Sequence, residues 1–235
     1  MKLSVITINR NNVTGLKRTL DSVYSQTCKD FEYIIIDGGS TDGSIEIIQQ
    51  FDSSSICRTW VSEPDTGVYN AMNKGIRLAS GDFLLFLNSG DWFASDNVVE
   101  NIFPHLNTDF EIISGELELI KGNNEKIKLF PPQIVNLNYC ISAGLTHPNT
   151  FIRKELFEKY GYYNEQNKII SDWEFFLVAC GLNQCKYKSI PILVSCFAMD
   201  GVSSNNDILL QQETKAALNR LLPWWKKLER LIRNK

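Results

Sequence analysis

The residues best suited to chemistry follow the most apolar stretch of the chain. Residues 83–87 read Phe-Leu-Leu-Phe-Leu, and residues 88–91 read Asn-Ser-Gly-Asp. Five apolar residues in a row are too few for a stable lone helix and are typical of a strand buried on both faces of a parallel sheet. Ligands of open α/β sheets bind beyond the carboxyl ends of the strands, so Asp91 is placed to meet a metal-bound phosphate. The same four residue types are common in turns, and a plain turn stays open.

A second polar segment follows another apolar run. Residues 37–43 read Asp-Gly-Gly-Ser-Thr-Asp-Gly, directly after Tyr-Ile-Ile-Ile at residues 33–36. One interpretation is a tight strand-to-helix turn in which the glycines supply positive φ. The other is a ligand loop, in which Asp37 accepts hydrogen bonds from a base or ribose. The segment has neither the GxGxxG pattern nor a P-loop lysine, so it does not specify a dinucleotide site or an ATPase.

A third candidate segment, residues 62–76, carries an acidic and a basic residue. Its second half has the spacing of a helix, which Asp65 or Thr66 is expected to cap. Lys74, near the exposed side of that helix, either reaches a diphosphate or is solvated like most lysines. The residues alone leave both alternatives open.

These candidates need a scaffold, and the apolar pattern supplies one. It predicts an alternation of strands and helices that is typical of a doubly wound or related nucleotide-binding sheet. The expected strands are residues 3–8, 31–36, 58–61, 83–87, 110–114, 117–120 and 190–197. The expected helices are residues 13–24, 44–50, 68–79, 97–103, 155–160, 173–179 and one from 208 onward. Residues 134–141 are ambiguous.

Composition indicates a soluble globular protein. The chain has 235 residues, is 43% hydrophobic and can bury one substantial core. Its formal net charge of −3 argues against a general nucleic-acid binder. The six cysteines form no CxxC pair or zinc-ligand spacing and indicate a reducing compartment. The apolar run at the N-terminus is too short for a signal peptide, and no stretch reaches the roughly 18 apolar residues of a membrane span, so a cytoplasmic protein is expected.

The C-terminal part differs in charge from the rest. From Ile208 onward there are seven Lys or Arg and two Glu, a balance of +5 that leaves −8 for residues 1–207. This part is predicted to be an amphipathic helical tail with Trp224 and Trp225. It either packs on the body or lies on an anionic membrane, as a peripheral contact at the inner face.

Four stretches together resemble the family 2 glycosyltransferases of the GT-A fold that build bacterial polysaccharide or lipopolysaccharide. They are residues 4–7, 37–43, 63–76 with Asn-Lys-Gly near the end, and 87–91. The resemblance covers roughly residues 1–200. It implies a mixed, mostly parallel sheet flanked by helices, with a glycosyltransferase domain at 1–206, divided into a nucleotide-binding half (about 1–93) and an acceptor half (about 94–206), and a helical basic tail at 207–235.

The resemblance implies a nucleotide-sugar site. Its donor is a UDP-sugar by default, and a divalent metal, Mn²⁺ or Mg²⁺, bridges the diphosphate from Asp91. The usual Asp-Ser-Asp-Asp reads Asn-Ser-Gly-Asp here, so one carboxylate survives, and the metal site is expected to be weak before the donor binds. The residues implied to hold the nucleotide are Thr7, Asn9, Asp37, Asp65, Lys74 and Asn88.

The resemblance also implies a catalytic base and an acceptor side. An inverting transfer needs a base within about 3 Å of the attacking hydroxyl. Asp172 occupies the family position, with Ser171 where a Glu is usual. Either residue also suits a helix N-cap, and both roles are compatible. His147, extended before a proline, and Trp173 are expected on the acceptor side.

The expected function is inverting transfer of a sugar from a nucleotide-diphosphate sugar to a hydroxyl of a glycan or lipid-linked acceptor, in cell-surface polysaccharide biosynthesis. One alternative is a non-catalytic nucleotide-sugar-binding subunit, suggested by Gly90 and Ser171 standing where carboxylates are usual. A sugar nucleotidyltransferase is the other. It would need a glycine- and lysine-rich loop that residues 7–17 do not supply.

Overall fold

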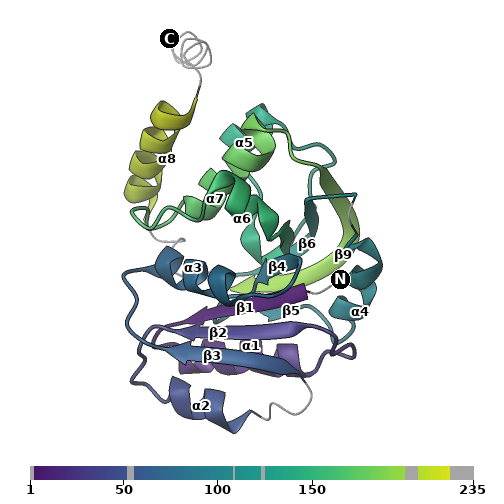
Figure 1. Ribbon diagram of the computed structural model, residues 1–235, viewed down its shortest axis with the longest axis vertical. Helices are drawn as coiled ribbons and strands as arrows, with labels where there is room; N and C mark the ends of the chain where they lie inside the picture. The colour runs from purple at the N-terminus through teal and green to yellow at the C-terminus, as the bar shows by residue number, and fades with distance from the viewer. Residues whose placement is uncertain (1–2, 52–55, 108, 123–124, 199–205, 223–235) are drawn as a thin grey trace.

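One mixed sheet runs through the molecule, with helices on both of its faces (Figure 1). The computed structural model describes residues 3–51, 56–107, 109–122, 125–198 and 206–222. Within them the strand order is β3-β2-β1-β4-β8-β6-β9-β5, and β7 pairs with β6. The strands are β1 (Leu3–Asn9), β2 (Glu32–Asp37), β3 (Cys57–Ser62), β4 (Phe83–Phe86), β5 (Trp92–Phe93), β6 (Ile112–Ile120), β7 (Lys126–Leu129), β8 (Thr150–Arg153) and β9 (Tyr187–Ala198).

The helices alternate with the strands in the first half of the chain and gather in the second. They are α1 (Val13–Tyr24), α2 (Ser44–Gln50), α3 (Val68–Leu78), α4 (Val98–Ile102), α5 (Leu137–Ser142), α6 (Glu155–Tyr160), α7 (Ser171–Phe176) and α8 (Asp207–Leu221). Short 3-10 turns lie at η1 (Phe103–His105) and η2 (His147–Asn149), and a π-helical turn, η3 (Leu177–Leu182), follows α7.

The N-terminal half is the expected nucleotide-binding type of sheet. Strands β3, β2, β1 and β4 are all parallel. Their register brings Asn9, Asp37 and Ser62 to adjacent positions at the carboxyl ends of three neighbouring strands. Parallel strands end at a common edge, so the polar residues that follow them collect there.

The second half extends the sheet with mixed directions. β8 is antiparallel to β4, β6 is antiparallel to β8, and β9 is parallel to β6. The two strands predicted at 110–114 and 117–120 form the single strand β6. The pairing with β9 continues past the interruption through a register irregularity between Ser114 and Leu117. The short strands β5, β7 and β8 were not predicted, since two to four residues show little periodicity.

Alternating side chains of the central strands divide the core into two layers. Ile6, Ile34 and Phe86 face the layer covered by α3, α6 and α7. Val5, Ile35 and Leu85 face the layer covered by α1, α2 and α4. A strand between two apolar layers is buried on both faces, which explains the continuous apolar runs in the sequence.

The described part of the predicted tail is a helix that packs on the body. Ala217, Leu218 and Leu222 are buried, the last two in the layer that contains α7. Trp224, Trp225 and the basic residues after them lie outside the described residues. Within the described ranges, no helix has both the length and the apolar character needed to cross a membrane. The division at residue 206 stays a prediction, as does the membrane contact of the tail.

Candidate functional site

A cavity of about 660 Å³ opens at the carboxyl ends of the central strands. Its walls come from the ends of β1 and β9, the turn after β4, the start of α3 and the segment before α7. Carboxylates from both halves of the chain line this one cavity, and they are Asp65, Asp91 and Asp172.

Asp37 lies behind the cavity wall and organises the loop that follows β2. Its Oδ1 accepts hydrogen bonds from Asn9 Nδ2 at 2.8 Å and Ser40 Oγ at 2.6 Å, and its Oδ2 accepts from Ser40 N–H at 2.8 Å and Ser62 Oγ at 2.7 Å. Burial raises the pKa of Asp37, but these hydrogen bonds outweigh it and hold the pKa below its usual range. A base or ribose would have to exchange with one of these partners, so the nucleotide contact of Asp37 stays a prediction.

Thr7 lies in β1, two residues before Asn9, and is fully buried. Its hydroxyl donates to the carbonyl of Leu87 at 2.7 Å and accepts from the Tyr33 hydroxyl at 2.9 Å. Thr7 therefore ties the end of β4 to β1 and does not reach the cavity, contrary to the sequence-based prediction. Asn9 does line the cavity, and its Oδ1 is a buried atom without a hydrogen-bond partner among the described residues.

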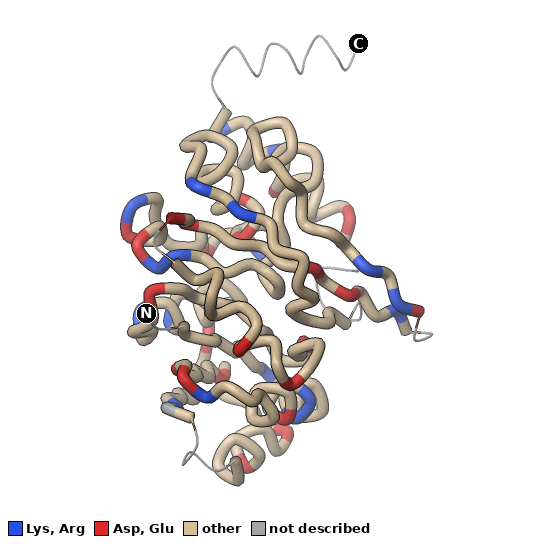
Figure 2. Tube along the Cα trace, turned by 90° about the vertical axis from the view of Figure 1, so that its right-hand side faces the viewer, with Lys and Arg blue, Asp and Glu red and all other residues tan. Residues whose placement is uncertain are grey.

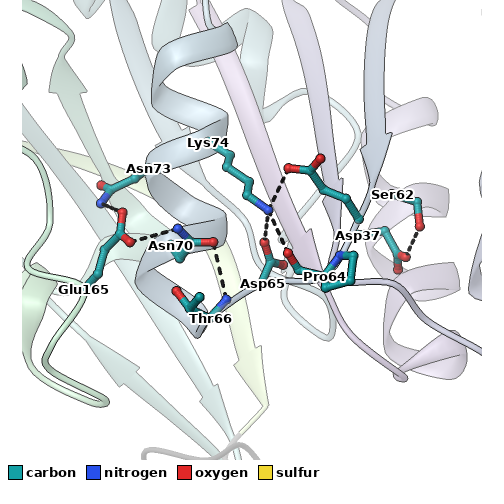
Figure 3. A network of polar contacts seen from close by, with 10 residues as sticks. Asp37, Ser62, Pro64, Asp65, Thr66, Asn70, Asn73, Lys74 and Glu165 are labelled. Carbon is teal, nitrogen blue, oxygen red and sulfur yellow. Dashed lines mark hydrogen bonds and ion pairs between the residues drawn. The ribbon is translucent and has the colours of Figure 1, made fainter.

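Lys74 pairs with the acidic segment before α3 (Figure 3). Its Nζ lies 2.6 Å from Asp65 Oδ1, 2.8 Å from Glu63 Oε1 and 3.1 Å from the Pro64 carbonyl. Lys74 does not line the cavity as the described residues form it, whereas Asp65 does. Lys74 thus orients Asp65, and the nucleotide contact of Lys74 stays a prediction. α3 itself begins after Gly67 without a side-chain cap, so the predicted capping by Asp65 or Thr66 is wrong.

A partly buried hydrogen-bond network fixes α3 against the second half of the chain (Figure 3). Asn73 donates to Glu165 Oε1 and to the Tyr163 carbonyl and accepts from Tyr163 N–H, at 2.8 to 3.0 Å. Asn70 donates to Glu165 Oε2 at 2.8 Å. These contacts hold α3 against residues 163–165 of the second half of the chain.

The turn after β4 presents Asp91 to the cavity. Its backbone N–H donates to the Asn88 carbonyl at 2.8 Å, and its carbonyl accepts from Thr19 Oγ1 at 2.6 Å. Gly90 has φ +108°, a conformation that L-residues with a side chain rarely adopt. Glycine, which adopts this conformation without strain, therefore suits the turn at position 90.

The residues present at this turn fit a divalent cation. Asp91, only 5% exposed, lines the cavity and supplies a hard carboxylate ligand. The Asn88 side-chain carbonyl, Oδ1, is buried and has no hydrogen-bond partner among the described residues. No group of three or more His, Cys, Asp or Glu side chains that could hold a metal exists in the described part of the chain. Mg²⁺ suits such a sparse set, since it commonly binds one or two carboxylates with substrate phosphates and water.

Asp172 lies across the cavity, held by two side chains. Its Oδ2 is 2.8 Å from His147 Nδ1, and its Oδ1 accepts a hydrogen bond from the Tyr69 hydroxyl at 3.0 Å. His147 Nε2 in turn lies 3.0 Å from Asn88 Nδ2, with donor and acceptor roles that depend on the histidine tautomer. One chain of contacts therefore runs from the turn after β4 through His147 to Asp172.

The electrostatics of this pair keep Asp172 ionised. Burial raises the pKa of Asp172. The hydrogen bond and charge of His147, the backbone N–H of Trp173 and the Tyr69 hydroxyl outweigh the effect of burial and lower the pKa. Burial lowers the pKa of His147, but the hydrogen bond and charge of Asp172, with the charge of Asp91, outweigh it and raise the pKa. The side chains of His147 and Asp172 are each 17% exposed, and their hydrogen bond stabilises the carboxylate form of Asp172.

Trp173 does not line the cavity as the described residues form it. Its indole N–H donates to the Cys140 carbonyl of α5 at 2.7 Å, and its ring packs over Gly144. Neither Ser171 nor Asp172 caps α7, because the N-cap position is Ile170 and Asp172 lies in the first helical turn. The predicted acceptor contact of Trp173 is thus not supported by its position, whereas His147 does line the cavity.

Sequence reasoning missed several residues of the cavity wall, among them Tyr69, Arg10 and Lys168. Tyr69 donates a hydrogen bond to Asp172, but in the sequence it is only one tyrosine within a helical pattern. Arg10 and Lys168 are exposed cations that line the cavity. For both, no hydrogen bond or ion pair of the side chain is found among the described residues, and no motif distinguishes them from solvated surface cations.

Replacing His147 with Ala is expected to shift the acid limb of the pH profile of kcat/KM to higher pH. The depressed pKa of Asp172 means that its ionised form is lost only as pH falls through that low value. Without the imidazole, burial dominates and the Asp172 pKa rises, so activity is lost at a higher pH. Tyr69→Phe, which removes one hydrogen bond and no charge, serves as control and is expected to move the limb less. An unchanged limb in the His147→Ala variant would contradict this electrostatic role.

Comparisons with known proteins agree on one family. A family model described as "Glycosyl transferase family 2" matches residues 4–161. A "PGL/p-HBAD biosynthesis glycosyltransferase" of Mycobacterium bovis is 30% identical over 207 residues, covering 87% of this chain and 76% of that protein. An uncharacterized glycosyltransferase of Mycobacterium tuberculosis is 32% identical over 209 residues, covering 87% of this chain and 78% of that protein.

Two solved structures share the fold. S. aureus TarS, in complex with UDP-GlcNAc, has a TM-score of 0.69 at 19% identity and aligns with 84% of this chain. A mannosyltransferase from Pyrobaculum calidifontis, in complex with GDP-Man and Mn²⁺, has a TM-score of 0.64 at 16% identity and aligns with 86% of this chain. The present chain spans 58% of the length of either structure.

Proposed function

Because this chain belongs to glycosyltransferase family 2 and is a glycosyltransferase, we propose that it transfers a sugar from a nucleotide-diphosphate sugar to a hydroxyl, with inversion at the anomeric carbon. The GT-A fold expected from the sequence is confirmed by the solved structures. The observation that carries the proposal is that Asp91 and Asp172, 81 positions apart in the chain, line one cavity.

In the proposed reaction Asp172 is the base. Its ionised carboxylate takes the proton of the acceptor hydroxyl as the oxygen forms a bond to the anomeric carbon. The bond from that carbon to the diphosphate oxygen breaks on the opposite face, and the nucleoside diphosphate leaves with the electron pair. His147 and Tyr69 hold the carboxylate of Asp172 in a fixed orientation at the cavity wall.

Asp91 and Asn88 are proposed to hold the divalent cation that family 2 enzymes commonly use. When bound, such a cation acts as a Lewis acid that neutralises the charge developing on the departing diphosphate. Asp65, oriented by Lys74, and Asn9 are proposed to contact the nucleotide, together with Asp37 if it exchanges a partner.

The donor is proposed to be a UDP-sugar, and the acceptor a glycan or lipid-linked hydroxyl of cell-surface polysaccharide biosynthesis. Relatives named for PGL/p-HBAD biosynthesis and a structural neighbour in complex with UDP-GlcNAc support this class. A GDP-sugar is the main alternative, since another neighbour was solved with GDP-Man. Lys and Arg are interspersed with Asp and Glu along the described trace, which supports a partner other than nucleic acid (Figure 2). A cytoplasmic location, expected from the cysteine pattern of the sequence, is part of this proposal.

A thermal-shift panel tests the donor assignment. UDP, GDP and dTDP and their sugars are each added with and without Mn²⁺, and ligands that bind the native state raise Tm. We expect the largest shift with UDP or a UDP-sugar in the presence of Mn²⁺, and donor hydrolysis under the same conditions. Binding without hydrolysis or transfer would favour the alternative of a non-catalytic nucleotide-sugar-binding subunit. No shift with any nucleotide would contradict the proposed function.

A further inference from the structure

The cavity wall beside Asp172 is held from outside by α8. Lys168 and Ile169 line the cavity just ahead of α7, in a segment without strand or helix hydrogen bonds. Glu213 of α8 accepts both of their backbone N–H groups, at 2.7 Å from Lys168 to Oε1 and 3.0 Å from Ile169 to Oε2. A single carboxylate therefore fixes two successive peptide planes of the wall.

A second contact joins α8 to α7 itself. Arg220 Nη2 lies 2.5 Å from Glu174 Oε1, and Glu174 Oε2 also accepts from Asn167 Nδ2 at 2.8 Å. Leu218 of α8 and Leu222, directly after the helix, are buried in the same core layer as α7. The helix is thus bound to the wall segment and to the helix that carries Asp172.

Hydrogen bonds connect residues 164–167, just before the wall residues, to Ser171 at the start of α7. Ser171 Oγ donates to the Asn164 carbonyl at 2.6 Å, and Asn167 Nδ2 donates to Ser171 Oγ at 3.2 Å. Ser171 directly precedes Asp172. A displacement of residues 168 and 169 is therefore transmitted to the residue beside the base.

The same segment reaches the nucleotide side of the cavity. The Lys168 ammonium lies near the start of α3, 4.0 Å from the position that a Cβ on Gly67 would take. The peptide that Glu213 holds thus carries an exposed cation facing the cavity, and it lies four residues before the base.

We propose that Glu213 is a positioning residue for the transfer reaction: from α8 it holds the wall of residues 168 and 169 and, through it, the geometry of Asp172 and Lys168. This inference rests on the proposed function for its chemistry. It assigns the described part of the predicted tail, α8, to the active-site architecture. Hydrogen bonds from backbone amides to a carboxylate are charge-assisted. The two bonds to Glu213 are therefore stronger than bonds to a neutral acceptor would be.

The test compares three full-length variants: Glu213→Ala, Glu213→Gln and, as matched control on the same helix, Gln212→Ala, whose side chain is exposed. Misplacement of a reacting group by about 1 Å can cost about 100-fold in rate, so Glu213→Ala is expected to lower kcat for hydrolysis of the preferred sugar nucleotide by about 10- to 100-fold. Glu213→Gln, which keeps a neutral acceptor, is expected to fall between Glu213→Ala and the parent protein. Gln212→Ala is expected to match the parent protein.

Hydrogen exchange separates positioning from general stabilisation. In the Glu213→Ala variant, the amides of Lys168 and Ile169 are expected to exchange faster, while the strands β1, β2 and β4 keep their protection. A kcat within about twofold of the parent, unchanged exchange at these two amides, or faster exchange throughout the protein would each overturn the proposal. If the parent protein binds no nucleotide, the proposed function fails, and the exchange data still report independently on whether Glu213 holds these two amides.

Discussion

Asp172→Asn is expected to abolish sugar transfer while nucleotide binding persists. A general base typically contributes about 100- to 10,000-fold to a rate, and the amide of asparagine cannot accept the proton of the acceptor hydroxyl. The substitution keeps the shape of the side chain and an oxygen for the Tyr69 hydroxyl, so the cavity wall should be preserved. The quantities to measure are kcat for transfer or donor hydrolysis, and the Tm shift caused by the nucleoside diphosphate.

The geometry of the site explains why the two measurements should separate. Asp172 comes from α7, whereas Asn9, Asp65 and Asp91 come from the N-terminal half of the sheet. The nucleotide is proposed to contact the second group and to leave Asp172 free for the acceptor. Removing the base should therefore lower kcat and leave nucleotide affinity nearly unchanged.

A matched surface variant controls for the loss of one negative charge. Asp96 accepts a hydrogen bond from Ser25 Oγ at 2.7 Å on an exposed loop and does not line the cavity. Asp96→Asn is expected to keep full turnover. Near-normal turnover in the Asp172→Asn variant would remove Asp172 from the mechanism, and equal losses in both variants would point to a general effect of charge.

The sheet could be predicted from the sequence where its strands are buried on both faces. The runs at residues 3–8, 33–36 and 83–87 form β1, β2 and β4, because a strand between two apolar layers needs no polar positions. β8 could not be predicted, since its four residues follow a 3-10 turn and pair with β4 and β6 only through tertiary contacts. β6 was predicted as two strands because its apolar pattern is interrupted. The sequence pattern alone cannot show that the chain continues as one strand through an irregular register.

The candidate site could be predicted as a set of strand ends, but not in the orientation of each side chain. Asp91 and Asp172 line the cavity, and their chemical roles stay proposals. Thr7 and Trp173 do not face it, because each finds a closer partner in the folded chain: the Leu87 carbonyl for Thr7 and the Cys140 carbonyl for Trp173. Such partners lie 80 and 33 positions away, and no local pattern encodes them.

Asp91→Asn is expected to remove the additional rise in Tm that Mn²⁺ gives in the presence of a nucleoside diphosphate. Asp91 is the one carboxylate of the turn after β4, and a neutral amide is a poor ligand for a hard cation. Lewis-acid stabilisation by a bound metal is worth several kcal/mol of transition-state energy. At about 1.4 kcal/mol per tenfold, turnover should fall by about 100-fold or more.

The fold should survive this substitution, because the backbone of Asp91 holds the turn. Its N–H and carbonyl bind Asn88 and Thr19, and both bonds are independent of the carboxylate. Ser89→Ala, in the same turn, is the matched control: the Ser89 hydroxyl donates to the Asn12 carbonyl, and its loss should leave the effect of Mn²⁺ intact. If Asp91→Asn keeps the full Mn²⁺-dependent shift, the cation is held elsewhere.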